Sequence, residues 1–186
     1  MKNYKDIQLL KLTYTNISPF WIYDRKQELV YLNIEGYLGT LTLIIPKSSI
    51  AAISKNFIYL SSKTKKYIGI TKTLLKRLVA NIKGVTTGYQ IHLVLSGVGY
   101  KVTSETSQLQ FYLGYSHKII VTIPKTIHVE ITNQGTGLTL KSINKIELGQ
   151  IAARIMALRP VDLYKGKGIT NILTKLNLKQ GKTKQH

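Results

Sequence analysis

Apolar and polar residues alternate along most of the chain, and alternation of this kind predicts short β-strands. In the first half we expect strands at 29–34, 41–45 and 57–60, separated by glycine and proline residues. In the second half the alternation resumes after residue 88. It predicts further strands at 91–95, 99–103, 109–113, 119–123, 127–131 and 138–140.

The spacing of apolar residues changes to that of a helix in two places. The first predicted helix covers 71–84, with its first residue, a threonine, as the N-cap and its last residue, a glycine, closing it. The second covers 144–158. Asn144 and Glu147 have the spacing of a capping box, and Pro160 ends the helix.

Both halves follow the same order, strands and then one helix, and they share a local signature. Ile-Pro-Lys-Ser-Ser-Ile at 45–50 is similar to Ile-Pro-Lys-Thr-Ile at 123–127. A chance match in a chain rich in isoleucine and lysine is the alternative. We predict an α+β protein of two tandem duplicated domains, each a small, mainly antiparallel sheet packed with one helix, followed by a basic C-terminal tail. The expected boundaries are an N-terminal extension at 1–15, domains at 16–84 and 85–163, and a basic loop and tail at 164–186.

Charge narrows the possible partners. The 186 residues include 27 Lys and Arg against 8 Asp and Glu, a net charge of +19, while 44% hydrophobic residues are enough to build cores. A polyanion is therefore the expected partner. Of the basic residues 23 are Lys and only 4 are Arg, which favours contacts to phosphate and to shape over base-specific recognition.

Residues that could support catalysis are missing or scattered. The chain has no cysteine, which excludes thiolate metal sites and cysteine nucleophiles, and its eight carboxylates form no acid/base pair. The histidines lack the spacing of metal ligands: His92, His117, His128 and His186. We therefore expect no enzyme, no cofactor, no metal and no transmembrane helix.

The segment 159–169 is the best candidate for binding. Two glycines alternate with two lysines there, so the backbone could approach a phosphate closely and offer main-chain N–H groups, while Tyr164 offers a flat face for a base or ribose. A solvated loop after a helix is the alternative. The tail from Leu163 onward continues the basic surface with no acid, through Lys165, Lys167, Lys175, Lys179, Lys182 and Lys184.

Several motifs of the second half occur in the order of a known family. They are Gly-Val-Gly-Tyr-Lys-Val at 97–102, Leu-Gly-Tyr-Ser-His at 113–117, Ile-Pro at 123–124, Leu-Gly-Gln-Ile-Ala-Ala at 148–153 with Arg-Pro at 159–160, and Tyr-Lys-Gly-Lys-Gly-Ile at 164–169. With these motifs the chain resembles the large-subunit ribosomal protein L6 family in its bacterial and organellar form. The first half resembles it only in the 34–41 turn and in the helix from Thr71.

The resemblance implies a protein that holds large-subunit rRNA near the sarcin–ricin loop and the base of the factor-binding stalk, and that catalyses nothing. The rRNA-binding residues it implies, together with the basic residues around them, are Lys101, Ser116, His117, Lys118, Arg159, Tyr164, Lys165, Gly166, Lys167, Gly168, Lys175, Lys179, Lys182 and Lys184. Two positions depart from the family, which usually has proline at both. Leu163 is expected to loosen the turn before the loop, and Lys118 to add a phosphate contact.

The expected partners are large-subunit rRNA and neighbouring large-subunit ribosomal proteins, with no membrane and no homo-oligomer. A stand-alone basic RNA-binding or ribosome-assembly factor is the alternative function. The residue usage of an AT-rich coding sequence, the lack of an import leader at the start and the weaker match of the first half together favour an organelle-encoded protein of the mitochondrion. A plastid or the cytoplasm of a low-GC bacterium are the alternative locations.

Overall fold

The computed structural model describes residues 8–11, 17–24, 29–54, 57–62, 64–105 and 108–181. The chain forms two compact units, Met1–Gly88 and Tyr89–His186. Each unit has a hydrophobic core of its own. Every strand pairing in both units is antiparallel, and the predicted α+β class is confirmed.

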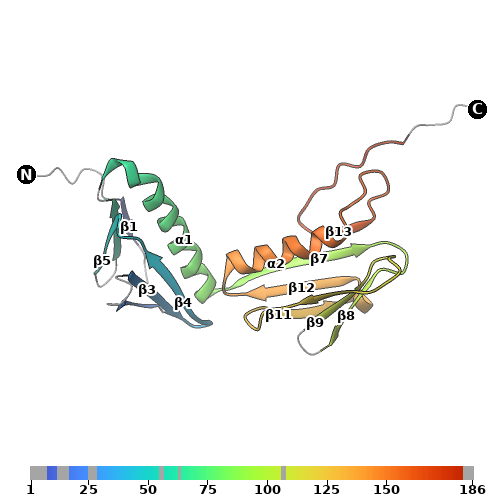
Figure 1. Ribbon diagram of the computed structural model, residues 1–186, viewed down its shortest axis with the longest axis horizontal. Coiled ribbons are helices and arrows are strands. Elements are labelled where there is room, and N and C mark those ends of the chain that lie inside the picture. The colour runs from blue at the N-terminus through green and yellow to red at the C-terminus, as the bar shows by residue number, and fades with distance from the viewer. Residues whose placement is uncertain are drawn as a thin grey trace, which may run out of the picture. The chain divides into compact units, whose positions relative to one another are not determined.

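The first unit contains two three-stranded sheets and one long helix, α1 (Figure 1). One sheet has the order β2-β3-β4 and the other the order β1-β6-β5. Leu32, Ile34, Leu43, Ile58 and Leu60 are fully or almost fully buried in the core of this unit. The strands are β1 (Gln8–Lys11), β2 (Ser18–Asp24), β3 (Leu29–Gly36), β4 (Gly39–Ile45), β5 (Ser49–Ser54) and β6 (Phe57–Ser62).

Helix α1 (Ile68–Thr86) follows a short 3-10 turn, η1 (Lys65–Tyr67), and is longer at both ends than predicted. Thr71 is not the N-cap. It is buried inside the helix, where its Oγ1 lies 3.3 Å from Ser49 Oγ and donates to the Tyr67 carbonyl at 3.3 Å. Gly84 does not end the helix either. The glycine with the left-handed conformation that closes it is Gly88, at φ +73°, whose N–H donates to the Gly84 carbonyl at 3.0 Å.

The second unit has a three-stranded sheet of order β10-β9-β8 and a four-stranded sheet of order β11-β12-β7-β13. Helix α2 (Lys145–Leu158) lies along one face of the four-stranded sheet (Figure 1). All six strands predicted for this half are present, and their ends lie within two residues of the predicted ones. The strands are β7 (Tyr89–Ser96), β8 (Lys101–Glu105), β9 (Gln108–Tyr112), β10 (Ile119–Thr122), β11 (His128–Thr132), β12 (Gly137–Ser142) and β13 (Gly168–Asn171), with a 3-10 turn η2 (Asn133–Gly135) before β12.

Two of the expected segment boundaries need correction, because each cuts off a strand that belongs to a sheet. The proposed extension at 1–15 includes β1, which pairs with β6. The proposed basic tail from 164 includes β13, which pairs with β7 and buries Ile169 in the core. A short strand at a sheet edge carries little pattern of its own, so alternation alone could not place either strand.

The start of α2 agrees with the prediction in part. Asn144 caps the helix, since its side-chain oxygen accepts hydrogen bonds from the N–H groups of Ile146 (3.1 Å) and Glu147 (3.4 Å). The reciprocal half of a capping box differs, because the Asn144 N–H donates to Ser142 Oγ at 3.1 Å.

The two units have the same topology, which supports an internal duplication. The sheet order β1-β6-β5 of the first unit corresponds to β7-β12-β11 of the second, and β2-β3-β4 corresponds to β8-β9-β10. The repeated Ile-Pro-Lys signature forms the same turn in both units: the Pro46 carbonyl accepts from the Ser49 N–H, and the Pro124 carbonyl from the Ile127 N–H, each at 3.0 Å. Strand β13 is an addition beyond this common plan.

Among the described residues, no helix combines the length and the apolar character needed to cross a membrane.

Candidate nucleic-acid interface

Two glycine-containing loops of the second unit meet at the ring of Tyr100, which is buried. An ideal Cβ at Gly97 would lie 2.7 Å from atoms of this ring, and one at Gly114 would lie 3.3 Å from it. Gly114 also has a left-handed backbone, at φ +74°. The two glycines thus let the turn after β7 and the loop after β9 pack on one aromatic side chain, and this brings two of the sequence motifs together.

Arg159, just beyond α2, lies over the ring of Tyr115, with 4.9 Å from its Cζ to the ring centroid. The Tyr115 hydroxyl donates to the Leu158 carbonyl at 3.1 Å. The His117 ring is stacked on the Tyr115 ring, with 6.4 Å between the ring centroids. A hydrogen bond with Tyr115, with Tyr100 contributing less, raises the pKa of Arg159 above its ordinary value. Arg159, charged like every guanidinium in a protein, is thus held against the Tyr115 ring.

The carboxylate of Asp162 organises the basic loop that follows. Its Oδ1 accepts from the Tyr164 N–H at 3.0 Å and its Oδ2 from the Lys165 N–H at 3.3 Å. Its carbonyl accepts from the Gly166 N–H, and its own N–H donates to the Lys167 carbonyl, both at 2.8 Å. This corrects the expectation that the loop offers its main-chain N–H groups to a phosphate, because those of residues 164–166 are used within the loop.

The two glycines of the loop have different structural roles. Gly166 has φ +66°, and an ideal Cβ there would make only an ordinary contact, 3.5 Å from the Leu178 side chain. Gly168 is buried and has φ +146°; its Cβ would lie 2.6 Å from Val161 Cα and 2.8 Å from the Pro160 carbonyl oxygen. Gly168 thus allows the chain to pass close to its own backbone, and because it is buried it does not offer the exposed contact expected of it.

The described part of the basic tail returns to this loop. The Lys179 N–H donates to the Leu163 carbonyl at 2.9 Å, and Leu178 lies beside Gly166. The Leu163 carbonyl therefore takes part in holding the loop, as the carbonyl of a proline at this position could also do, and the loosening expected from the lack of a proline stays a prediction. Exposed lysine side chains of the loop and tail are Lys165, Lys167, Lys175 and Lys179. Lys182 and Lys184 lie outside the described residues.

Lys101, Ser116 and Lys118 are exposed around the same motifs. Lys101 Nζ lies 5.0 Å from the centroid of the Tyr112 ring on the neighbouring strand β9. Lys118 Nζ donates to Gln110 Oε1 at 3.0 Å, and Gln110 in turn donates to Glu105. The Lys118 side chain thus lies along the β9–β10 pair, and its ammonium group already has a hydrogen-bond partner within the unit.

Of the remaining histidines, His92 and His128 have structural surroundings, and His186 lies outside the described residues. His92 Nδ1 lies 3.0 Å from Thr139 Oγ1, its partner across β7 and β12, and His128 Nε2 lies 3.6 Å from Glu130 Oε1. Over the described ranges there is no group of three or more His, Cys, Asp or Glu that could hold a metal ion.

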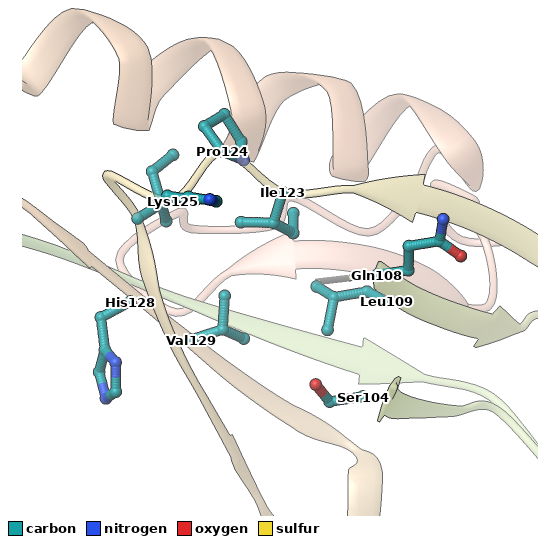
Figure 2. Close-up of a pocket in the computed structure, with 9 residues that line it drawn as sticks. Ser104, Gln108, Leu109, Ile123, Pro124, Lys125, His128 and Val129 are labelled. Atoms are coloured by element: carbon teal, nitrogen blue, oxygen red, sulfur yellow. The ribbon is translucent and has the colours of Figure 1, made fainter. Parts of the chain in front are cut away.

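A hollow of about 310 Å³ lies at the turn after β10 (Figure 2). Pro124 and Lys125 line it together with Leu109 and Val129. The corresponding turn of the first unit, at Pro46, has a similar hollow of about 380 Å³. Because both copies of the repeat have it, the hollow is best explained by the strand-turn-strand geometry that the units share.

Comparison with known proteins adds an independent line of evidence. The sequence model for ribosomal protein L6 matches residues 96–172, a range that contains the loops described above. The large ribosomal subunit protein uL6 of Alkaliphilus oremlandii (strain OhILAs) is 37% identical over 155 residues, which cover 81% of this chain and 84% of that protein. The chain belongs to the ribosomal protein L6 family.

Other L6 family members give the same result. The uL6 protein of Geotalea uraniireducens (strain Rf4) is 37% identical over 157 residues, covering 82% of this chain and 86% of that protein. The uL6 protein of Anaeromyxobacter sp. (strain Fw109-5) is 38% identical over 123 residues, which cover 66% of this chain and 67% of that protein. The L6 family is structural and non-enzymatic, as predicted.

Three residues that organise the L6-type loops were missed as functional residues from the sequence: Tyr100, Tyr115 and Asp162. Only Asp162 gave a usable signal, because an Asp two and three residues before the N–H groups it binds is typical of an Asx turn.

Proposed function

We propose that this chain is a structural protein of the large ribosomal subunit and that it binds large-subunit rRNA through the second unit. The observation that carries the proposal is the loop closed by Asp162. It presents the exposed side chains of Tyr164, Lys165 and Lys167, and Arg159 lies at its base, where the Arg159 carbonyl accepts from the Ile169 N–H at 3.0 Å. Family membership supports it, since the relatives are named large ribosomal subunit proteins.

The loop is suited to bind a phosphate backbone because it is ordered before binding. Its hydrogen bonds to Asp162 fix the main chain, so that less conformational entropy is lost when the lysines contact RNA. Each lysine offers a compact charge to a phosphate, and the 60% exposed Tyr164 ring offers a surface on which an unpaired base can stack. Arg159 adds a fixed planar cation.

Within the subunit, the proposed site on rRNA lies near the sarcin–ricin loop and the base of the factor-binding stalk, with neighbouring ribosomal proteins as further partners. For the compartment we propose the mitochondrion, because lysine outnumbers arginine 23 to 4 as an AT-rich coding sequence would dictate. The relatives are bacterial, so the cytoplasm of a low-GC bacterium is one alternative, and a plastid is the other. Locating the gene in a mitochondrial, a plastid or a bacterial genome decides between them.

The double substitution Lys165→Gln with Lys167→Gln tests the loop. Filter binding of the full chain to large-subunit rRNA over a range of salt concentrations measures how many phosphates are neutralised. Losing two phosphate contacts lowers the log–log slope by about 1.4 to 1.8. The control, Lys125→Gln with Lys145→Gln, removes the same charge from exposed positions elsewhere in the unit. Equal slopes for the two double variants would overturn the loop assignment.

A further inference from the structure

Helix α1 carries a stripe of residues on its solvent face, in the first unit and outside the L6 loops. Gly69, Lys72, Lys76, Val79 and Lys83 follow one another at intervals of three and four residues, so they lie along one side of the helix. All five are exposed. The buried residues of the helix include Leu74 and Leu78, which face the sheets. We call these five residues the α1 stripe.

The stripe lies in a part of the sequence that has no acidic residue. From residue 36 to residue 104 there is no Asp or Glu, while ten lysines and arginines occur. Lys72 and Lys76 are therefore far in sequence from any carboxylate. The one acidic side chain described in this unit, Glu35, accepts from the Ser18 hydroxyl at 3.4 Å, in the β2-β3-β4 sheet. The positive potential along α1 is thus not balanced by acids of the same helix.

Gly69 is the second feature of the α1 stripe that indicates a partner outside the chain. It is the second residue of α1, ahead of the interior positions at which a glycine costs about 1 kcal/mol relative to alanine. At Gly69 an ideal Cβ would meet nothing within 4 Å. Packing within the chain therefore does not explain this glycine, whereas a backbone that approaches the helix from outside would.

The spacing of the stripe suits a phosphate backbone. With a rise of 1.5 Å per residue, Lys72 and Lys76 are about 6 Å apart along the helix and Lys83 lies about 10 Å further on. A row of lysines with one valine and no aromatic residue is unlike the core of a protein interface, from which lysine is depleted. Contacts from lysine to phosphate need no such core.

We propose that the α1 stripe is a second RNA-binding surface, which seats the phosphates of a double-stranded rRNA segment against Gly69, Lys72 and Lys76. This inference rests on the proposed function, since it takes the chain to be part of the large subunit. It gives each unit its own contact with RNA: the loop closed by Asp162 in the second unit, and the outer face of a helix in the first.

Acetylation of lysines in the assembled large subunit tests this proposal. Lys72 and Lys76 are expected to be protected relative to the free chain and to become reactive after ribonuclease treatment. Lys125, exposed at the turn after β10 of the second unit, is the internal control and is expected to stay reactive throughout. Lack of protection at Lys72 and Lys76, or protection that survives ribonuclease and so comes from a protein, would overturn the proposal.

Variants separate this surface from the loop of the second unit. Lys72→Gln with Lys76→Gln is expected to lower the salt slope of rRNA binding by about 1.8, as for two contacts to duplex phosphates. Arg77→Gln with Lys125→Gln, which removes the same charge from exposed positions outside the stripe, is expected to leave the slope unchanged. Gly69→Gln adds bulk without charge and is expected to weaken binding while the first unit keeps its thermal stability. If wild type binds rRNA but the variants of the α1 stripe bind like their control, the stripe is not an RNA-binding surface and the proposal for the loop of the second unit is unaffected. If wild type does not bind rRNA, the proposed function itself is wrong.

Discussion

The carboxylate of Asp162 shows how a single acidic residue can serve a basic surface. In a chain of net charge +19 an acid beside the lysines of the loop opposes the attraction to phosphate. Its two oxygens nevertheless hold the N–H groups of Tyr164 and Lys165. Removing the Asp162 carboxylate should strengthen RNA binding if its negative charge matters most, and weaken it if the hydrogen bonds that order the loop matter most. The structure favours the second effect.

Replacing Asp162 with alanine tests which effect dominates. By charge alone Asp162→Ala should bind rRNA more tightly. We expect it to bind about fivefold more weakly, or about 1 kcal/mol, because the loop loses two hydrogen bonds to a charged acceptor. Filter binding at fixed salt measures the difference. Glu147→Ala, which makes the same charge change in the first turn of α2, is the control, and a variant at Asp162 that binds as tightly as this control would show that order does not dominate.

The two glycines of the loop give a second prediction at the scale of single residues. Gly166→Ala meets only the strain of a left-handed backbone and is expected to cost about 1 kcal/mol. Gly168→Ala also places a Cβ against the backbone of Pro160 and Val161, which cannot move aside as a side chain could, and is expected to cost about 2 to 3 kcal/mol. Thermal unfolding of the two variants measures the order of these costs, and the reverse order would show that the close approach is not required.

At the scale of elements, the sequence predicted what depends on local pattern. The strands of the second unit and the Asn144 cap follow from alternation and from a short polar side chain before a helical stripe. The ends of α1 could not be predicted in this way, because Thr71, the expected N-cap, is buried and hydrogen-bonded to Ser49 in another element of the unit. Strands β1, β2, β5 and β13 were also missed. Each lies at the edge of its sheet and is defined by the strand it pairs with and not by its own residues.

The pairing of β11 with β12 gives a prediction about pH. A hydrogen bond from Lys141 Nζ at 2.6 Å lowers the pKa of Glu130, and the nearby His128 and His92 act in the same direction. A carboxyl whose pKa is lower in the folded state stabilises that state above its unfolded pKa, and this contribution is lost as the pH falls through the folded pKa. Lys141→Gln is therefore expected to raise the pKa of Glu130 and to lower the unfolding free energy near neutral pH only.

Chemical denaturation of wild type and Lys141→Gln at pH 7 and at pH 2.5 measures this, together with an NMR titration of Glu130. The effect is expected to be small, because both side chains are 43% exposed. A stability difference of the same size at both pH values would show that the ion pair is not its cause.

At the scale of the whole molecule, duplication and charge were the properties that the sequence predicted best. The Ile-Pro-Lys signature marked the same turn in both units, and the shared sheet orders extend the similarity to the complete strand plan. The geometry of the interface was less predictable. The positions of Lys165 and Lys167 were predicted, but the contact of Gly114 with the ring of Tyr100 joins two separate sequence motifs, and local pattern does not show that they meet.

Sedimentation of a gently lysed source extract tests whether the chain is a resident protein of the large ribosomal subunit. The chain is quantified across a sucrose gradient at low and high salt, with and without ribonuclease. We expect it to migrate with the large subunit in a one-to-one ratio and to be released when the RNA is digested. A chain that migrates free, or that is present on mature large subunits in much less than one copy, would contradict the proposed function and would indicate a transient RNA-binding or assembly factor.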